Sequence, residues 1–182
     1  MISPPYQIIY ADPPWDYGGQ RQHNSRGDDT GGADKHYPTL TDHELVEMDV
    51  AKLADPDGTL LFLWTTGPMM FRSLAVMDGW GFQYATMGFV WYKESTNPGY
   101  YTMSQTEFCL IGKINKIPQP RGARNVRQLV SAPRGLHSQK PDEVREAITA
   151  MFPDQNKVEL FARTHWHNWD TWGMEVGDVE PW

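Results

Sequence analysis

The segment Thr59–Thr66 constrains the fold of this chain more than any other feature of its sequence. It reads Thr-Leu-Leu-Phe-Leu-Trp-Thr-Thr, so a strand here presents apolar side chains on both of its faces. Such a strand belongs in the middle of a parallel sheet that helices cover on both sides. A second short apolar run, Ile8–Ala11, leads into Asp-Pro-Pro-Trp at residues 12–15. Because proline cannot donate to a ladder, we expect this strand to end there.

Helix and strand signals alternate along the rest of the chain. Thr41 followed by Glu44 is a capping box that predicts a helix to about Leu53, and Pro68 opens a helix that Gly79 ends. Further elements are predicted as strands over 82–93 and 107–113, a helix from residue 141, and a last strand over 157–162. This order predicts an α/β fold with three layers (αβα), in which a mostly parallel sheet lies between two layers of helices. The whole chain, residues 1–182, is expected to form a single domain.

Several classes of protein are disfavoured by the composition. The one cysteine, Cys109, lies in an apolar run and is expected to be a buried structural thiol. No apolar run approaches the roughly 18 residues of a membrane span, and no signal peptide precedes the first strand, so we expect a cytoplasmic protein without membrane contact. His165 and His167 alternate but have no obvious third ligand, so we expect no metal site.

The distribution of charge is uneven. The formal net charge is −7, which disfavours a polyanionic partner, yet residues 108–141 contain no acid. The basic residues of this segment are Lys113, Lys116, Arg121, Arg124, Arg127, Arg134 and Lys140. A long stretch of one sign predicts a local surface that contacts phosphates. The alternative is a solvated basic loop without a partner.

The residue types at positions 12–15 suit one demanding reaction. The lone pair of an adenine N6 amine is delocalised into the ring, which makes the nitrogen a poor nucleophile. Two acceptors on the N6 hydrogens, the carboxylate of Asp12 and the carbonyl of Pro13, would favour a pyramidal amine, and Pro13 and Pro14 would hold them in place. Trp15 offers a face on which an extruded base can stack. The alternative is a strand end and a proline turn, with Trp15 in the core.

The same motif resembles the catalytic motif of the DPPW-type N6-adenine methyltransferases, a family that includes the eukaryotic messenger-RNA adenine methyltransferase and bacterial and phage relatives. The resemblance extends over almost the whole chain. Further segments that resemble family motifs, in the same order, are 37–44, 61–67, 91–93, 107–112, 137–143, 159–163 and 169–175.

The resemblance implies a permuted Rossmann-like methyltransferase that uses S-adenosylmethionine, with the substrate motif before the cofactor strand. It implies that Lys140 meets the carboxylate end of the cofactor, that Arg163, Thr164 and His165 lie beside the cofactor with Asp12, and that Glu175 binds the ribose hydroxyls. The residues assigned to the substrate are Trp15, Tyr37, Glu107, Arg121, Arg124, Arg127 and Arg134. Met174 stands where many relatives have asparagine, which removes one candidate ribose hydrogen bond.

The resemblance therefore predicts methyl transfer to the N6 amine of adenine in a nucleic acid, with DNA favoured over RNA. One alternative is a non-catalytic nucleic-acid-binding subunit of the same fold, although such subunits lose the Asp-Pro-Pro-Trp acceptors. Another is a cytosine N4 methyltransferase, in which serine usually replaces the leading aspartate. A small-molecule target is disfavoured by the basic stretch. A homodimer would add surface for gripping the nucleic acid.

Overall fold

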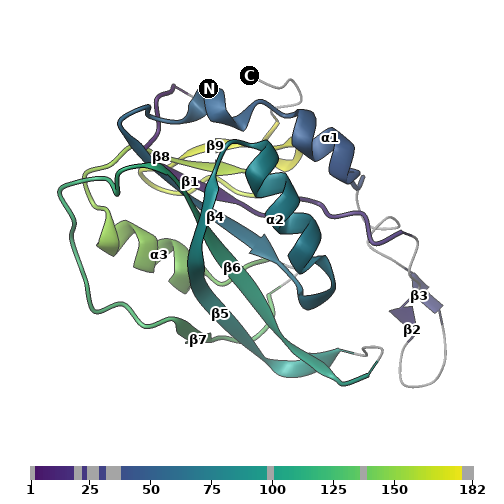
Figure 1. The fold of residues 1–182 in the computed structure, drawn as a ribbon. Helices are drawn as coiled ribbons and strands as arrows, with labels where there is room; N and C mark the ends of the chain where they lie inside the picture. Colours follow the sequence, from purple (N-terminus) through teal and green to yellow (C-terminus); the bar gives the residue numbers. More distant parts are fainter. Residues whose placement is uncertain are drawn as a thin grey trace.

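The computed structural model describes residues 3–18, 22–23, 29–31, 38–97, 101–135 and 139–177. Within these residues one seven-stranded sheet has the order β7-β5-β6-β4-β1-β8-β9, and a small hairpin stands apart from it (Figure 1). The strands of the main sheet are β1 (Ile8–Ala11), β4 (Gly58–Thr65), β5 (Gln83–Asn97), β6 (Ser104–Asn115), β7 (Leu129–Ser131), β8 (Lys157–Leu160) and β9 (Asp170–Trp172). The hairpin consists of β2 (Gln22–His23) and β3 (Asp29–Gly31).

The main sheet is mostly parallel, which confirms the prediction. Strand β1 pairs in parallel with β4 and β8, β8 with β9, and β5 with β7. Only β6 runs the other way, antiparallel to both β4 and β5. Every residue of β4 is buried, as its two apolar faces predicted. Its neighbours are one parallel and one antiparallel strand rather than two parallel ones.

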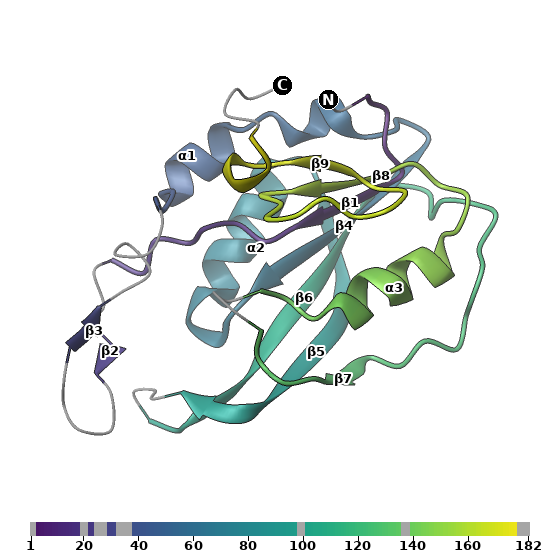
Figure 2. The ribbon, with the colours of Figure 1, turned by 180° about the vertical axis from the view of Figure 1, so that it is seen from behind.

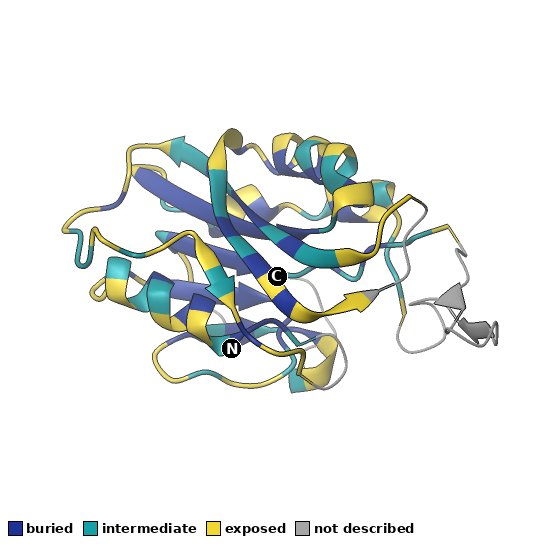
Figure 3. Ribbon diagram, turned by 90° about the horizontal axis from the view of Figure 1, so that it is seen from below, coloured by how far each residue is buried: buried dark blue, intermediate teal, exposed yellow. Residues whose placement is uncertain are grey.

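Helices cover both faces of the sheet and give the three layers of the predicted α/β fold. Helices α1 (Asp42–Glu47) and α2 (Met70–Gly79) lie on one face and α3 (Asp142–Met151) on the other (Figure 1; Figure 2). Alternate residues of the central strands supply the two apolar layers. Ile9 and Leu61 pack with α1 and α2, whereas Tyr10 and Phe62 pack with α3. Figure 3 shows the buried strands between more exposed helices.

The first helix is shorter than the sequence predicts. Thr41 and Glu44 do form the capping box, but α1 ends at Glu47, and a separate 3-10 helix, η2, spans Val50–Leu53. In one continuous helix Val50 would point about 140° away from the buried Leu45. The break at Met48, which has an extended backbone, allows both side chains to be buried in the same core.

The strand predicted over 157–162 is shorter than expected, and it is not the last strand. Strand β8 ends at Leu160, because Phe161 has a φ of +61° and turns the chain out of the strand. Strand β9 follows it and is therefore the last strand of the described residues. Both β7 and β9 have three residues each and were not predicted, because runs so short carry no readable alternation.

The topology brings several segments to one end of the sheet. Because β1, β4 and β8 are parallel, residues 12–17, 66–67 and 161–166 all follow carboxyl ends at the same edge. Ligands of open α/β sheets bind outside this edge. None of the helices that the structure describes is long and apolar enough to cross a membrane.

Candidate active site

The turn after β1 is held on both sides by backbone hydrogen bonds. The amide of Trp15 donates to the carbonyl of Pro13 (2.9 Å), and the amide of Leu40 donates to the carbonyl of Pro14 (2.9 Å). The amide of Asp16 donates back to Leu40 (3.2 Å). The turn is thus fixed before any ligand arrives. The Pro13 carbonyl keeps acceptor capacity, because a carbonyl oxygen has two lone pairs.

Trp15 does not offer the open stacking face that its position suggested. Its ring is 4% exposed and belongs to the apolar core on the α1–α2 side, and its indole N–H donates to the carbonyl of Trp64 (3.1 Å). Trp15 is therefore a core residue that also lines the pocket, and its contact with a substrate base stays a prediction. The aromatic side chain closest in sequence that lines the pocket is Tyr17, whose hydroxyl lies 3.4 Å from that of Thr66.

Four charged side chains of alternating sign lie in one continuous chain at this edge. The ammonium of Lys140 contacts the carboxylate of Asp12 at 2.7 Å and that of Glu107 at 3.3 Å. The other oxygen of Glu107 lies 3.3 Å from the ammonium of Lys93. Lys93, Glu107 and Lys140 are all at least nine-tenths buried. Sequence reasoning named Asp12, Glu107 and Lys140 but missed Lys93.

These contacts change the protonation equilibria of the chain. Burial raises the pKa of Asp12, while Lys140 acts in the opposite direction and moderates the rise. Burial would also raise the pKa of Glu107, but Lys140 and Lys93 outweigh it and the net direction is downward. Burial would lower the pKa of Lys140, yet Asp12 and Glu107 together raise it. Lys140 is therefore a firmly charged group between two acids.

A pocket lies directly over this chain of charges. Its lining residues are Asp12, Pro13, Pro14, Trp15, Tyr17, Thr65, Thr66, Glu107, Lys140 and Arg163. They come from the ends of β1, β4 and β8, from β6, and from the segment before α3. Sequence segments 128 residues apart thus meet in one polar cavity.

The residues assigned to the cofactor gather beside this pocket. Arg163 lines it, and its guanidinium lies 3.7 Å from the carboxylate of Glu175. His165 is bonded through Nδ1 to the hydroxyl of Thr171 on β9 (2.7 Å), and Thr164 is exposed between them. Of Arg163, Thr164, His165 and Glu175, only Arg163 lines the pocket, and contact of these residues with a cofactor stays a prediction.

Helix α3 anchors the segment that carries Arg163. Buried Arg145 bridges Glu159 on β8 and Asp142 on its own helix, at 2.9 Å each. Its guanidinium also lies over the ring of Trp166, 4.9 Å from the ring centre. One arginine therefore ties the helix, the strand and the following loop together.

The basic segment does not converge on the pocket. Lys113 and Lys116 lie at the far end of the sheet, opposite Gly58 and Leu60 at the start of β4. Arg121 stacks on Phe152, past the carboxyl end of α3 and at the opposite end of that helix from Lys140. It does not line this pocket, and its contact with a substrate stays a prediction. Arg124 and Arg127 are exposed in the segment before β7 and Arg134 in the segment after it, and of the segment's lysines and arginines only Lys140 lines the pocket. Tyr37 lies outside the described residues.

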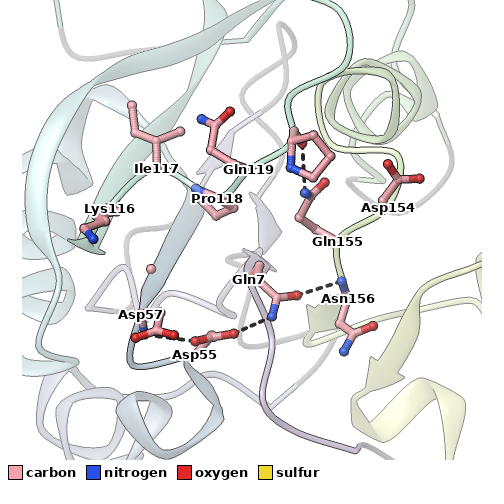
Figure 4. A pocket seen from close by; sticks show the side chains of 12 residues that line it. Gln7, Asp55, Asp57, Lys116, Ile117, Pro118, Gln119, Asp154, Gln155 and Asn156 are labelled. Atoms are coloured by element: carbon pink, nitrogen blue, oxygen red, sulfur yellow. Dashed lines mark hydrogen bonds between the residues drawn. The ribbon is translucent and has the colours of Figure 1, made fainter.

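A second cavity lies at the other end of β1 from Asp12 (Figure 4). Several of its polar side chains are hydrogen-bonded within its walls: Gln7 donates to Asp55 and accepts from the amide of Asn156, and Gln155 donates to the carbonyl of Pro120. The two bonds of Gln7 link the segments that precede β1, β4 and β8. Among the described residues, no group of three or more histidine, cysteine or carboxylate side chains is placed to hold a metal ion.

Comparison with known proteins agrees with this geometry. The MT-A70 family model matches residues 6–175. The chain is 50% identical over 184 residues to the type II methyltransferase M.MunI of a Mycoplasma species, covering 95% of this chain and 78% of the relative. It is 28% identical to the human N(6)-adenosine-methyltransferase catalytic subunit METTL3, covering 96% of this chain but 29% of the relative. The chain therefore belongs to the MT-A70 family of methyltransferases.

Proposed function

We propose that this chain transfers the methyl group of S-adenosylmethionine to the N6 amine of adenine in DNA, at the pocket over Asp12. The observation that carries the proposal is the position of Asp12. The motif predicted from its residue types lies at the carboxyl end of β1, in a pre-formed turn, beside the buried Lys140 and Glu107.

The residues present fit this cofactor. The pocket and its rim combine cationic groups (Lys140, Arg163) with carboxylates (Asp12, Glu175), which suits a ligand that carries a carboxylate, an ammonium and a ribose diol. Gly173 shapes the same region: a Cβ on it would lie 2.5 Å from the carbonyl oxygen of Ala162, so only glycine lets the ends of β8 and β9 approach this closely.

The chain's own residues supply placement and electrostatics. When bound, S-adenosylmethionine supplies an electrophilic methyl carbon on a sulfonium. The carboxylate of Asp12 and the carbonyl of Pro13 accept hydrogen bonds from the two N–H groups of the N6 amine. These bonds localise the lone pair of the nitrogen and direct it toward that carbon. The backbone bonds of the 12–15 turn hold both acceptors, so little reorganisation accompanies the reaction. The excess proton on N6 after transfer passes to Asp12 or to solvent.

Adenine is favoured over cytosine because Asp12 stands where cytosine N4 relatives usually have serine. The METTL3 relatives are named as N(6)-adenosine methyltransferases, which favours the same target. DNA is favoured over RNA because the relative with 50% identity carries a type II methyltransferase name, and type II methyltransferases modify DNA. The non-catalytic alternative is disfavoured because the acceptors of the motif are all in place.

The test is incubation with isotopically labelled S-adenosylmethionine and four substrates, namely single- and double-stranded DNA and RNA of random sequence. The products are digested to nucleosides, which are identified by mass spectrometry. Labelled N6-methyldeoxyadenosine is the expected product. Label only on RNA would refute the choice of polymer, and label on cytosine would refute the choice of base. Cofactor binding without any transfer would favour the non-catalytic reading.

A further inference from the structure

Lys93 is the one member of the charged chain that does not line the pocket. It sits on β5, two residues beyond Trp91, which pairs with Glu107 on β6. Residues two apart on a strand share a face, so Lys93 and Glu107 form a diagonal cross-strand pair on the α3 side of the sheet. Lys93 is 3% exposed, and its ammonium reaches Glu107 at 3.3 Å.

We propose that Lys93 is a positioning residue for methyl transfer, which acts through Glu107 by fixing that carboxylate between two ammonium groups. This inference rests on the proposed function. Lys93 takes one oxygen of Glu107, and Lys140 takes the other. Held at both oxygens, Glu107 has one orientation, and Lys140 is shared between Glu107 and Asp12 in a fixed geometry.

The burial of the pair gives the physical reason for this arrangement. An ionised carboxylate at the depth of Glu107 is costly unless it is paired, because desolvation penalises its charge. The titratable groups around it are Lys93 from β5, Lys140 from the segment before α3, Asp12 from the end of β1, and Tyr17, whose hydroxyl is neutral because its pKa is raised. Two cations face two acids, so the chain is neutral as a whole. Removal of Lys93 leaves two acids competing for Lys140.

Competition for Lys140 has a consequence at the reacting end. With Lys93 absent, Lys140 is drawn toward Glu107, and its 2.7 Å contact with Asp12 lengthens. The orientation of the N6 acceptor then changes without the loss of any group that touches the substrate. A displacement of about 1 Å at a reacting group costs on the order of 100-fold in rate.

The test is a double-mutant cycle of Lys93→Met and Glu107→Gln, with single-turnover rates and dissociation constants for S-adenosylmethionine. Lys93→Met is expected to lower the rate by about 10- to 100-fold while the dissociation constant stays within about threefold. In the Glu107→Gln background the same change is expected to have little further effect, because its target is gone. Lys93→Arg is expected to restore most of the rate.

The matched control is Lys157→Met, because Lys157 is a buried lysine of β8 at the opposite end of the sheet, bonded to the carbonyls of Pro153 and Gln155. The single-turnover rate of Lys157→Met, measured on equal amounts of folded protein, is expected to match that of the wild type. Equal rate losses in Lys93→Met and Lys157→Met, or multiplicative losses for Lys93→Met and Glu107→Gln, would overturn the inference. If Lys93→Met does not fold, Lys93→Gln serves in the same cycle.

A titration of the Glu107 carboxyl by carbon NMR separates this inference from the proposed function, because it needs no turnover. Lys93→Met is expected to raise the pKa of Glu107 by about one pH unit or more, since an opposite charge has been removed. An unchanged Glu107 titration overturns the role of Lys93 even if adenine is methylated. A raised pKa in a protein that methylates nothing upholds the pair and refutes the proposed function.

Discussion

At the scale of single residues, Asp12 is subject to two opposed influences. Burial raises its pKa, and the ammonium of Lys140 at 2.7 Å opposes the rise. A carboxylate accepts hydrogen bonds from an amine fully only when it is ionised. The protonation of Asp12 therefore couples the solution pH directly to the proposed reaction.

We predict that kcat/KM falls at acid pH with a midpoint above about 3.9, the ordinary pKa of an aspartate. Loss of Lys140 removes the group that lowers the pKa of Asp12, so Lys140→Met should move this acid limb to higher pH in addition to slowing the reaction. Rates measured between about pH 4 and pH 9 give the midpoint. A limb that stays fixed, or moves to lower pH, in Lys140→Met contradicts the assignment of the limb to Asp12.

At the scale of elements, the contact between α3 and β8 depends on one buried arginine. Arg145 is 3% exposed and contacts Glu159, Asp142 and the ring of Trp166. Burial raises the pKa of Glu159 to about 7, and Arg145 opposes that rise. Removal of the arginine leaves a buried carboxyl group without its cation.

We predict that Arg145→Met lowers the free energy of unfolding by about 3–5 kcal/mol, the usual cost of breaking a buried pair by removing one partner. Glu146→Ala, an exposed change on the same helix, should cost at most about 0.5 kcal/mol. Urea unfolding measures both. The double change Arg145→Met with Glu159→Leu should recover much of the loss. A cost for Arg145→Met no larger than that of Glu146→Ala would show that the pair contributes nothing.

The ends of β8 and β9 lie close together at Gly173. In Gly173→Ala the new Cβ would collide with the backbone of Ala162, 2.5 Å from its oxygen, and separate Arg163 from Glu175. We expect the dissociation constant for S-adenosylmethionine to rise by about 10-fold or more. Gly67→Ala is the control, because a Cβ there meets nothing within 4 Å. Calorimetry that finds equal affinities for the two variants would remove the cofactor from this end of the sheet.

At the scale of the whole molecule, the sheet gathers the site at one end while the basic segment runs along its length. Lys116 lies beside the start of β4, and Arg134 lies beyond the end of β7, toward the pocket. A duplex that presents an adenine to Asp12 therefore passes much closer to Arg134 than to Lys116.

We predict that Arg134→Ala weakens DNA binding and reduces the slope of log affinity against log salt by about one, because one phosphate contact is lost. Lys116→Ala should change neither quantity. Binding titrations at several salt concentrations measure both variants. The opposite ranking of the two variants would place the DNA on another face of the molecule.

The predictable parts of this molecule are those with local signals. The buried β4, the strand end at Asp12 and the capping box at Thr41 follow from apolar runs, prolines and helix caps. The edge strands β7 and β9, the core position of Trp15 and the role of Lys93 depend on partners far along the chain. Lys93 stands beside two aromatic residues in a strand, and only the register of β5 with β6 places it against Glu107.

The role of Asp12 is tested by the single-turnover rate of Asp12→Asn with labelled S-adenosylmethionine and duplex DNA. Asparagine keeps the size of the side chain and removes its charge. At saturating cofactor we expect a loss of about 100-fold or more in the rate of N6-methyladenine formation. A rate equal to that of the wild type would contradict the claim that the Asp12 carboxylate carries the transfer.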